Sequence, residues 1–448
     1  MRNLLYYILL LGFLISFTAA WSQDSEKAAQ ERERIFNMLQ QHENLIKVGK
    51  AIDEYRTKYG SGGDGEGLGP IMRKYHLMRE RARLNGEFEP AVISKELQKV
   101  KSLRLPSKEQ SPGWTEMGPR TSSNVTGHWA PGIGRIDVIE VNPANPDQIF
   151  VGTPTGGLWK TTDGGENWAC MNENLPVIGV AGMAIDWNNP DIIYLGTGDK
   201  DAGDVNSVGV YKSVDGGNSW TQTNLTFDVN LSLNIRSMKM HPSDPSTIFV
   251  GYTNGMYKTT DGGATWVKVL DSGNYNEIDD IEFKPGDPDI LYAVSYSTSR
   301  FYKSTDGGNS FVAKDMPYSF DDRSRLKVEV TEANPEYVYV LTTSAIYRSA
   351  NSGESFVKTG DYPGRAGGTH YMYAFAASPD NPEEIHVGEM ESYRSTDGGQ
   401  SFEKTTEWLW GNSVGYTHCD FHVMKFVGST LWVGSDGLVC KSEDNGDT

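Results

Sequence analysis

The segment GLWKTTDGGENW, residues 157–168, returns in similar form up to the end of the chain. Its repeated part, Ser/Thr-x-Asp-x-Gly followed by an aromatic residue, is called the signature turn below. The further copies are SVDGGNSW (213–220), TTDGGATW (259–266), STDGGNSF (304–311), SANSGESF (349–356), STDGGQSF (395–402) and SEDNGDT (442–448). The acidic position falls at Asp163, Asp215, Asp261, Asp306, Asn351, Asp397 and Asp444, mostly about 45–47 residues apart. A period of about 40–50 residues is the length of one four-stranded propeller blade.

Each repeat follows the same plan. An apolar segment comes first, as at 136–141, 235–240 and 278–283, and an Asn/Asp/Pro-rich turn leads into a second apolar segment. A third segment ends in the signature turn, and a fourth follows the aromatic residue. The sequence therefore predicts an all-β propeller of four-stranded blades, with seven repeats visible. Because the seventh copy stops at Thr448, before its aromatic position, we expect the natural protein to be longer.

The signature turn has the chemistry of a hairpin. An Asp at a turn accepts hydrogen bonds from backbone N–H groups that follow it, and paired glycines such as Gly164 and Gly165 allow positive φ. Asn351 keeps the acceptor and loses the charge. We therefore interpret the seven equivalent positions as structural residues and not as catalytic acids.

The N-terminal part differs in composition. Residues 1–22 have the pattern of a secretory leader, with Arg2 before the apolar run 4–17 and small residues after it. Residues 23–111 form a helical region, with helical spacing over 25–59 and 71–84. Residues 112–448 form the propeller, and GWTEMGPR (113–120) is expected to supply an outer strand that closes the ring.

The composition excludes some partners. The formal net charge of −18 argues against nucleic acid and anionic membranes, which favour Lys/Arg patches. We expect a monomer that is free of the membrane once the leader is removed. Cys170, Cys419 and Cys440 leave two alternatives open, a bridge between the last two or free buried thiols.

The signature turns resemble Asp-box repeats, also called bacterial neuraminidase (BNR) repeats, over about residues 130–448. With the leader, GWTEMGPR and GGLWKTTDGG (156–165), the chain resembles secreted propeller proteins of Bacteroidetes-type bacteria, of the glycosyl hydrolase-like and sortilin-like kinds. The resemblance implies a secreted or cell-surface β-propeller that acts on extracellular polymers or proteins.

A second resemblance concerns residues 149–160, which are similar to a segment of xyloglucan-type endoglucanases. In that family the motif T-D-x-G-G-L-Y carries a catalytic Asp, whereas this chain has TPTGGLW at 153–159. Pro154 thus stands where the resemblance places the catalytic Asp. This departure argues against glucanase activity, and no catalytic residue is assigned.

His418, Asp420 and His422 form an H-x-D-x-H segment within YTHCDFHVMKF (416–426). If this segment is a strand, period-2 alternation places the three side chains on one face. They are candidate ligands for a cation, since His and Asp bind transition metals. The alternative is a hydrogen-bonded polar ladder. We expect no other cofactor.

Charged residues at the corresponding place in other repeats are further candidates for lining the channel. They are Arg135, Asp137, Arg236, Asp279, Asp280, Arg325 and His370. The leading hypothesis is a secreted binding or scaffold propeller that recognises an extracellular glycan or protein through its channel face. The alternatives are a glycoside hydrolase, which needs two carboxyl groups about 5–9.5 Å apart, and a sortilin-like peptide-binding module.

Overall fold

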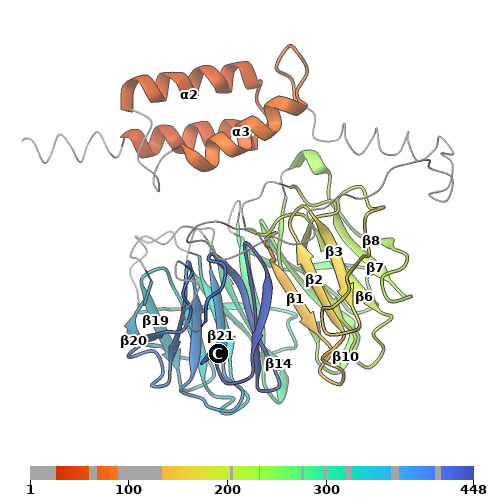
Figure 1. The fold of residues 1–448 in the computed structure, drawn as a ribbon, viewed down its shortest axis with the longest axis vertical. Coiled ribbons are helices and arrows are strands. Elements are labelled where there is room, and N and C mark those ends of the chain that lie inside the picture. Colours follow the sequence, from red (N-terminus) through yellow and green to blue (C-terminus); the bar gives the residue numbers. More distant parts are fainter. Residues whose placement is uncertain are drawn as a thin grey trace, which may run out of the picture. The chain divides into compact units, whose positions relative to one another are not determined.

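The computed structural model describes residues 27–59, 68–88, 134–201, 205–231, 233–273, 277–296, 300–317, 325–364, 373–408 and 415–447. The chain divides into two compact units, Met1–Ile93 and Ser94–Thr448, and each is considered by itself. The predicted leader, the strand predicted at 113–120 and His370 lie outside the described residues. Figure 1 shows both units coloured along the sequence.

The first unit is helical, as its residue spacing predicts. Residues 27–40 form a helix, followed by α2 (Leu45–Tyr59) and α3 (Gly69–Arg81). Apolar residues three and four positions apart place one face of each helix in a shared core. This core includes Ile35, Leu39, Val48, Ile52 and Met78. Among the described helices, none has the length and apolar character needed to cross a bilayer.

The second unit is built from seven antiparallel sheets, which are the blades. Blade 1 contains β1 (Val138–Val141), β2 (Ile149–Thr153), β3 (Gly157–Thr161) and β4 (Ala169–Cys170). Blade 2 contains β5 (Val180–Ile185), β6 (Ile193–Thr197), β7 (Gly209–Ser213) and β8 (Thr221–Thr226). Blade 3 contains β9 (Ile235–His241), β10 (Asp244–Tyr252), β11 (Gly255–Thr259) and β12 (Val267–Asp271).

The remaining blades repeat this order. Blade 4 contains β13 (Ile278–Lys284), β14 (Asp287–Ser295), β15 (Arg300–Ser304) and β16 (Val312–Lys314). Blade 5 contains β17 (Lys327–Val330), β18 (Val338–Leu341), β19 (Ala345–Ser349) and β20 (Val357–Asp361). Blade 6 contains β21 (Ala374–Ala377), β22 (Ile385–Gly388), β23 (Ser392–Ser395) and β24 (Glu403–Lys404). Blade 7 contains β25 (Phe421–Val427), β26 (Thr430–Ser435) and β27 (Val439–Ser442).

The seven blades close into a ring. The first strands of successive blades contact one another, and β1 contacts β25 and β26 of blade 7. The Ile136 N–H donates to the Ser435 carbonyl oxygen at 2.9 Å, and Trp432 packs in one core with Ile139. In Figure 1 the yellow strands of blade 1 and the blue strands of blade 7 belong to this closed ring. The all-β propeller predicted from the repeats is therefore confirmed, with three strands of blade 7 among the described residues.

The signature turns join the third and fourth strands, and their acids are hydrogen-bonded within the turn. In the third copy, Asp261 Oδ1 accepts the Thr265 N–H and the Thr259 hydroxyl, both at 2.8 Å. Hydrogen bonds from Thr265 lead the interactions that lower the pKa of Asp261 to about 2. Asn351 accepts the equivalent bond from the Ser355 N–H at 3.0 Å. A neutral amide can therefore take the place of the carboxylate in this turn.

In five of the blades, a row of three side chains crosses the sheet and ends at the signature turn of the next blade. In blade 3, Lys239, Phe249 and Lys258 occupy matching positions on β9, β10 and β11. Lys258 Nζ lies 5.4 Å from the centroid of the Phe249 ring and donates to the Gly307 carbonyl oxygen in the next signature turn at 2.7 Å. The equivalent cations that reach the next signature turn are Lys160, Lys212, Lys303 and Arg394. These contacts tie neighbouring blades together and favour one register around the ring.

We predict that Ser349→Ala lowers the free energy of unfolding by about 1–3 kcal/mol, because it leaves a buried backbone N–H without an acceptor. The Ser349 hydroxyl accepts the Gly353 N–H at 2.8 Å and donates to Asn351 Oδ1 at 2.8 Å. Urea unfolding followed by tryptophan fluorescence measures the difference. The control is Ser355→Ala in the same turn, an exposed site where the effect should stay within about 0.5 kcal/mol. Equal effects of the two substitutions would contradict the role of the Ser349 hydroxyl.

Candidate functional site

A cavity of about 910 Å³ runs along the centre of the ring, between the first strands of the blades. At one end it is lined by the buried residues Asp137, Lys200 and His422. At the other end it is lined by turn residues, of which Pro242 and Gly286 are exposed. The cavity therefore opens to solvent at the turn end and is closed by charged groups at the other.

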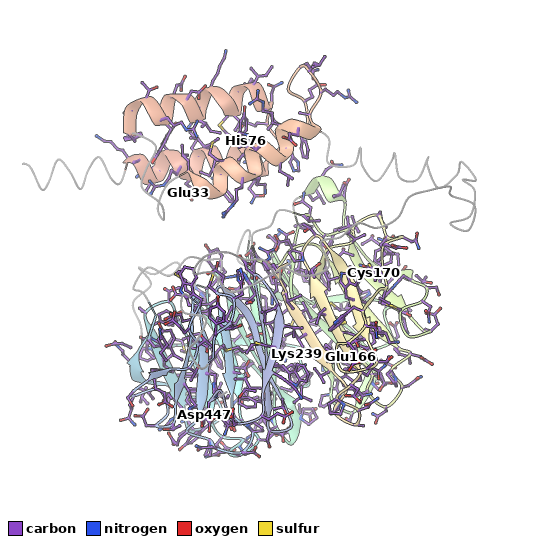
Figure 2. The ribbon with its side chains drawn as sticks, in the orientation of Figure 1. Glu33, His76, Glu166, Cys170, Lys239 and Asp447 are labelled. Atoms are coloured by element: carbon purple, nitrogen blue, oxygen red, sulfur yellow. The ribbon has the colours of Figure 1, made fainter. Side chains whose placement is uncertain are left out.

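Each blade has one residue on its first strand that is equivalent to those of the other blades. This residue is identified by its partner in the strand pairing, which is a bulky residue at the same place on the second strand of every blade. The partners are Phe150, Tyr194, Phe249, Tyr292, Tyr339, His386 and Trp432. We call the seven first-strand residues the central ring. In blade order they are Glu140, Ala184, Lys239, Glu282, Glu329, Ala376 and Lys425, and all except Ala184 line the cavity. Figure 2 labels Lys239, the central-ring residue of blade 3.

Two ion pairs neutralise four of the five charges of the central ring. Lys239 Nζ lies 2.5 Å from Glu282 Oε1 of the next blade. Lys425 Nζ lies 2.7 Å from Glu140 Oε1, across the boundary between blades 7 and 1. Glu329 has Glu282 and Ala376 as its neighbours in the ring. Within the described part of the chain, no hydrogen bond or ion pair is made to its carboxyl group.

The electrostatics of the central ring favour the protonated form of Glu329. Burial raises the pKa of Glu329 well above its usual range, and Glu282 and Asp280 raise it further. Lys239 and Lys327 act in the opposite direction but do not reverse the shift. Lys327 Nζ is directed to another acid, with Asp280 Oδ2 at 3.7 Å. The pKa of Glu329 is therefore raised, because its carboxyl group is buried beside other acids and has no ion pair in the described residues.

The closed end is built from residues at irregularities of the first strands. Arg236, Asp279 and His422 each fall at a register shift, where the strand has one residue more than its partner. Such a bulge turns a side chain away from the regular alternation. These charged side chains thereby reach the buried end of the channel, whereas the regular positions supply the central ring.

The residues that follow β6 cross this closed end and are held there by ion pairs. Asp201 lies 2.7 Å from Arg325 and 3.0 Å from His422 Nδ1, and His422 Nε2 lies 2.8 Å from Asp436. Lys200 Nζ donates to the Asp137 carbonyl oxygen at 2.5 Å. Burial opposes the charged form of His422, but hydrogen bonds to Asp201 and Asp436 raise its pKa to about 9. His422 is therefore an imidazolium at neutral pH.

Asp137 is the exception within this network. Its side chain has no exposed area, and neither carboxylate oxygen makes a well-formed hydrogen bond with the described residues. Its ionic contact is Arg135 Nε at 3.1 Å from Oδ1. Burial, and next the charge of Asp201, raise the pKa of Asp137 to about 7. A second carboxyl group without a well-formed hydrogen bond thus lies at the closed end.

The candidate residues predicted from the sequence do not all lie in one site. Arg135, Asp137, Arg325 and His422 meet at the closed end of the channel. Arg236 forms an ion pair with Glu277 of blade 4.

The H-x-D-x-H segment does not form the predicted strand. Because β25 begins at Phe421, His418 and Asp420 precede the strand, and the alternation expected for them does not apply. Asp420 has a φ of 65°, and His418 Nδ1 lies 3.0 Å from the Cys419 carbonyl oxygen. His422 alone of the three joins the closed end. All three cysteines are free.

A different set of residues comes together as possible metal ligands. Ligand atoms of Asp137, Asp201 and His422 lie within 4.8 Å of one another, and these are donors that transition metals accept. However, both ring nitrogens of His422 face carboxylates, and Arg325 neutralises Asp201. A metal ion would have to displace the imidazolium proton beside the cations Arg135 and Lys200. The donor set therefore fits a proton better than a metal ion.

No residue of the central ring was predicted from the sequence. Glu140, Lys239, Glu282, Glu329 and Lys425 were not among the candidates. The pattern that could have found them is a charged residue at a fixed place inside five of the seven apolar segments, as in DVIEV (137–141) and RSMKM (236–240). Buried first strands are otherwise apolar, so a charge that recurs at one position indicates a shared surface.

The place of the expected glucanase acid holds no carboxyl group. Pro154 is buried in the turn after β2, and the Pro154 carbonyl oxygen lies against Gly179, where an added Cβ would come within 2.2 Å. Neighbouring acids do occur elsewhere, at Glu282 and Glu329 on adjacent strands.

The comparisons with known proteins agree with this architecture. No family model matches the chain. A xyloglucanase from a Paenibacillus species is 28% identical over 151 residues, which is 31% of this chain and 14% of that protein. The alignment therefore leaves most of the xyloglucanase outside the match.

Two solved structures resemble the propeller. The GH74 xyloglucanase from Xanthomonas campestris superimposes with a TM-score of 0.54 at 17% identity, over 72% of this chain and 54% of that one. A YCF48 protein bound to D1 peptide superimposes with a TM-score of 0.50 at 16% identity, over 70% of this chain and 93% of that one. The chain thus spans about half the length of the solved xyloglucanase. These similarities establish a shared propeller fold.

We predict that the free energy of unfolding falls as pH rises from about 6.5 to 9, by up to about 3 kcal/mol from His422. The pKa of His422 is raised in the folded protein, so its contribution is complete below 6.5 and is lost as pH passes about 9. Urea unfolding at a series of pH values measures this slope. The His422→Gln variant should show a smaller slope, and an unchanged slope in that variant would contradict the assignment.

Proposed function

We propose that this chain is a ligand-binding β-propeller, and that the open end of its channel admits part of an extracellular polymer or protein. The observation that carries the proposal is a cavity of about 910 Å³ with charged residues at its equivalent positions. The first strands of a propeller are commonly small and apolar, so an open channel with internal charges is suited to polar recognition. The leader pattern at residues 1–22 and the net charge of −18 support a secreted or cell-surface location.

Binding without hydrolysis is favoured by the chemistry available. Pro154 cannot act as an acid or base. The seven signature turns each use the Ser/Thr hydroxyl to hold the Asp or Asn side chain at 2.7–2.8 Å, which leaves these groups committed to the turn. At the closed end, Asp201 is paired with Arg325 and His422, and these residues lie away from the open mouth.

Glycoside hydrolysis is the second candidate. It is supported by the similarity to a xyloglucanase and by the neighbouring acids Glu282 and Glu329, of which a protonated Glu329 would be the general acid. Glu282, however, is engaged by Lys239 at 2.5 Å. A peptide-binding module of the sortilin-like kind would use the same open channel as the leading proposal.

We predict that the purified chain binds members of a glycan or peptide array and releases no reducing ends from xyloglucan. Ala376→Leu should weaken the binding at least tenfold, because the added side chain enters the central ring beside Glu329. The matched control is Val267→Leu, on an exposed position of β12. Melting temperatures of both variants check folding. Turnover of xyloglucan, or binding that Ala376→Leu leaves intact in a folded protein, would overturn the proposal.

A further inference from the structure

The central ring contains one more acid than it contains bases. Glu140 and Glu282 each have a lysine within 2.7 Å, and each lysine has an acid of its own. Glu329 is left between a carboxylate on one side and the methyl group of Ala376 on the other. The acid of the central ring that has no lysine partner therefore lies at the boundary between blades 5 and 6.

The surroundings of this space define what would fit. The residues two positions earlier on the same strands include Lys327, which pairs with Asp280 at 3.7 Å, and Ala374, which is apolar. Toward the open mouth the cavity is lined by Phe283, Phe426 and proline-containing turns. At the closed end the buried carboxyl group of Asp137 also lacks well-formed hydrogen bonds. An entering group thus passes aromatic and proline side chains, with Lys284 and Glu332 beside them, and then reaches the carboxyl group of Glu329.

We propose that the channel binds a primary ammonium group on a flexible apolar stem, such as a lysine side chain of an extracellular peptide, with Glu329 as its counter-ion. The stem contacts the aromatic and proline residues of the mouth, and the ammonium group occupies the space above Ala376. An ammonium group supplies three donors and one positive charge, which is what Glu329 lacks. A neutral sugar would supply donors without the charge. This inference rests on the proposed binding function and specifies its ligand.

Binding of an ammonium group is expected to change the protonation of Glu329. Burial raises the pKa of Glu329 in the free protein, and Glu282, Asp280, Lys239 and Lys327 are the charged groups that face it. A cation bound beside Glu329 favours the ionised carboxylate, so binding releases up to one proton. Affinity for an ammonium ligand should therefore rise with pH. A neutral ligand has no reason to release that proton.

The test uses two probes that differ at one side chain, the blocked tripeptide acetyl-Gly-Lys-Gly-amide and the same peptide with an acetylated lysine, which has no charge and one N–H donor in place of three. Isothermal titration calorimetry of the full chain, in buffers of different ionisation enthalpy, gives affinity and proton release together. We expect the lysine peptide to bind at least tenfold more tightly than the acetylated one and to release a proton. Equal affinities, or no binding of the lysine peptide at millimolar concentration, would overturn the inference.

Three variants locate the site. Glu329→Gln should abolish the preference between the two peptides, and Ala376→Lys should abolish binding because its own ammonium group fills the space. The matched control is Glu166→Gln, which removes an acid from an exposed signature turn and should retain the preference. A preference that survives Glu329→Gln would overturn the inference. Binding of a glycan that is insensitive to Glu329→Gln would overturn it too, while leaving the proposed function in place.

Discussion

The closure of seven sheets around one axis is the constraint on which the rest of this structure depends. Closure brings the same register position of every first strand to the same level of the channel. The charge and size of a residue at this position must therefore be compatible with the equivalent residues of the two adjacent blades. The rows that end at Lys160, Lys212, Lys258, Lys303 and Arg394 hold this register from the outside. The central ring is the result on the inside.

Two kinds of acid illustrate how position decides role. The acids of the signature turns have many donors, and the pKa of Asp261 is lowered to about 2 by hydrogen bonds led by that of the Thr265 side chain. Glu329 has no such donors in the described chain, and burial raises its pKa. The same functional group is therefore a fixed structural anchor at the rim of the propeller and an incompletely satisfied group in the channel. Recognition of a ligand is expected where satisfaction is incomplete.

The fold was predictable because it depends on interactions between residues that are close in the sequence. Turn residues, glycines and the repeat length are properties of neighbouring residues, and they specified seven blades and the helical preface. The site was predictable only in part. Arg135, Asp137 and Arg325 were predicted as charges at corresponding places in the repeats, and His422 was predicted from the H-x-D-x-H segment. The bulge that turns His422 inward, however, depends on pairing with β26. The ion pairs of Lys239 and Lys425, and hence the isolation of Glu329, depend on which blades become neighbours when the ring closes.

The most direct measurement of the central claim is the pKa of the Glu329 side chain in the free protein. Carbon-13 labelling of glutamate, with Glu329→Gln to assign the resonance, follows its carboxyl shift through a pH titration. We predict that the Glu329 resonance titrates well above the usual range of a glutamate. A midpoint near 4.5, the ordinary value for a solvated glutamate, would show that the carboxyl group is already satisfied and would contradict the account.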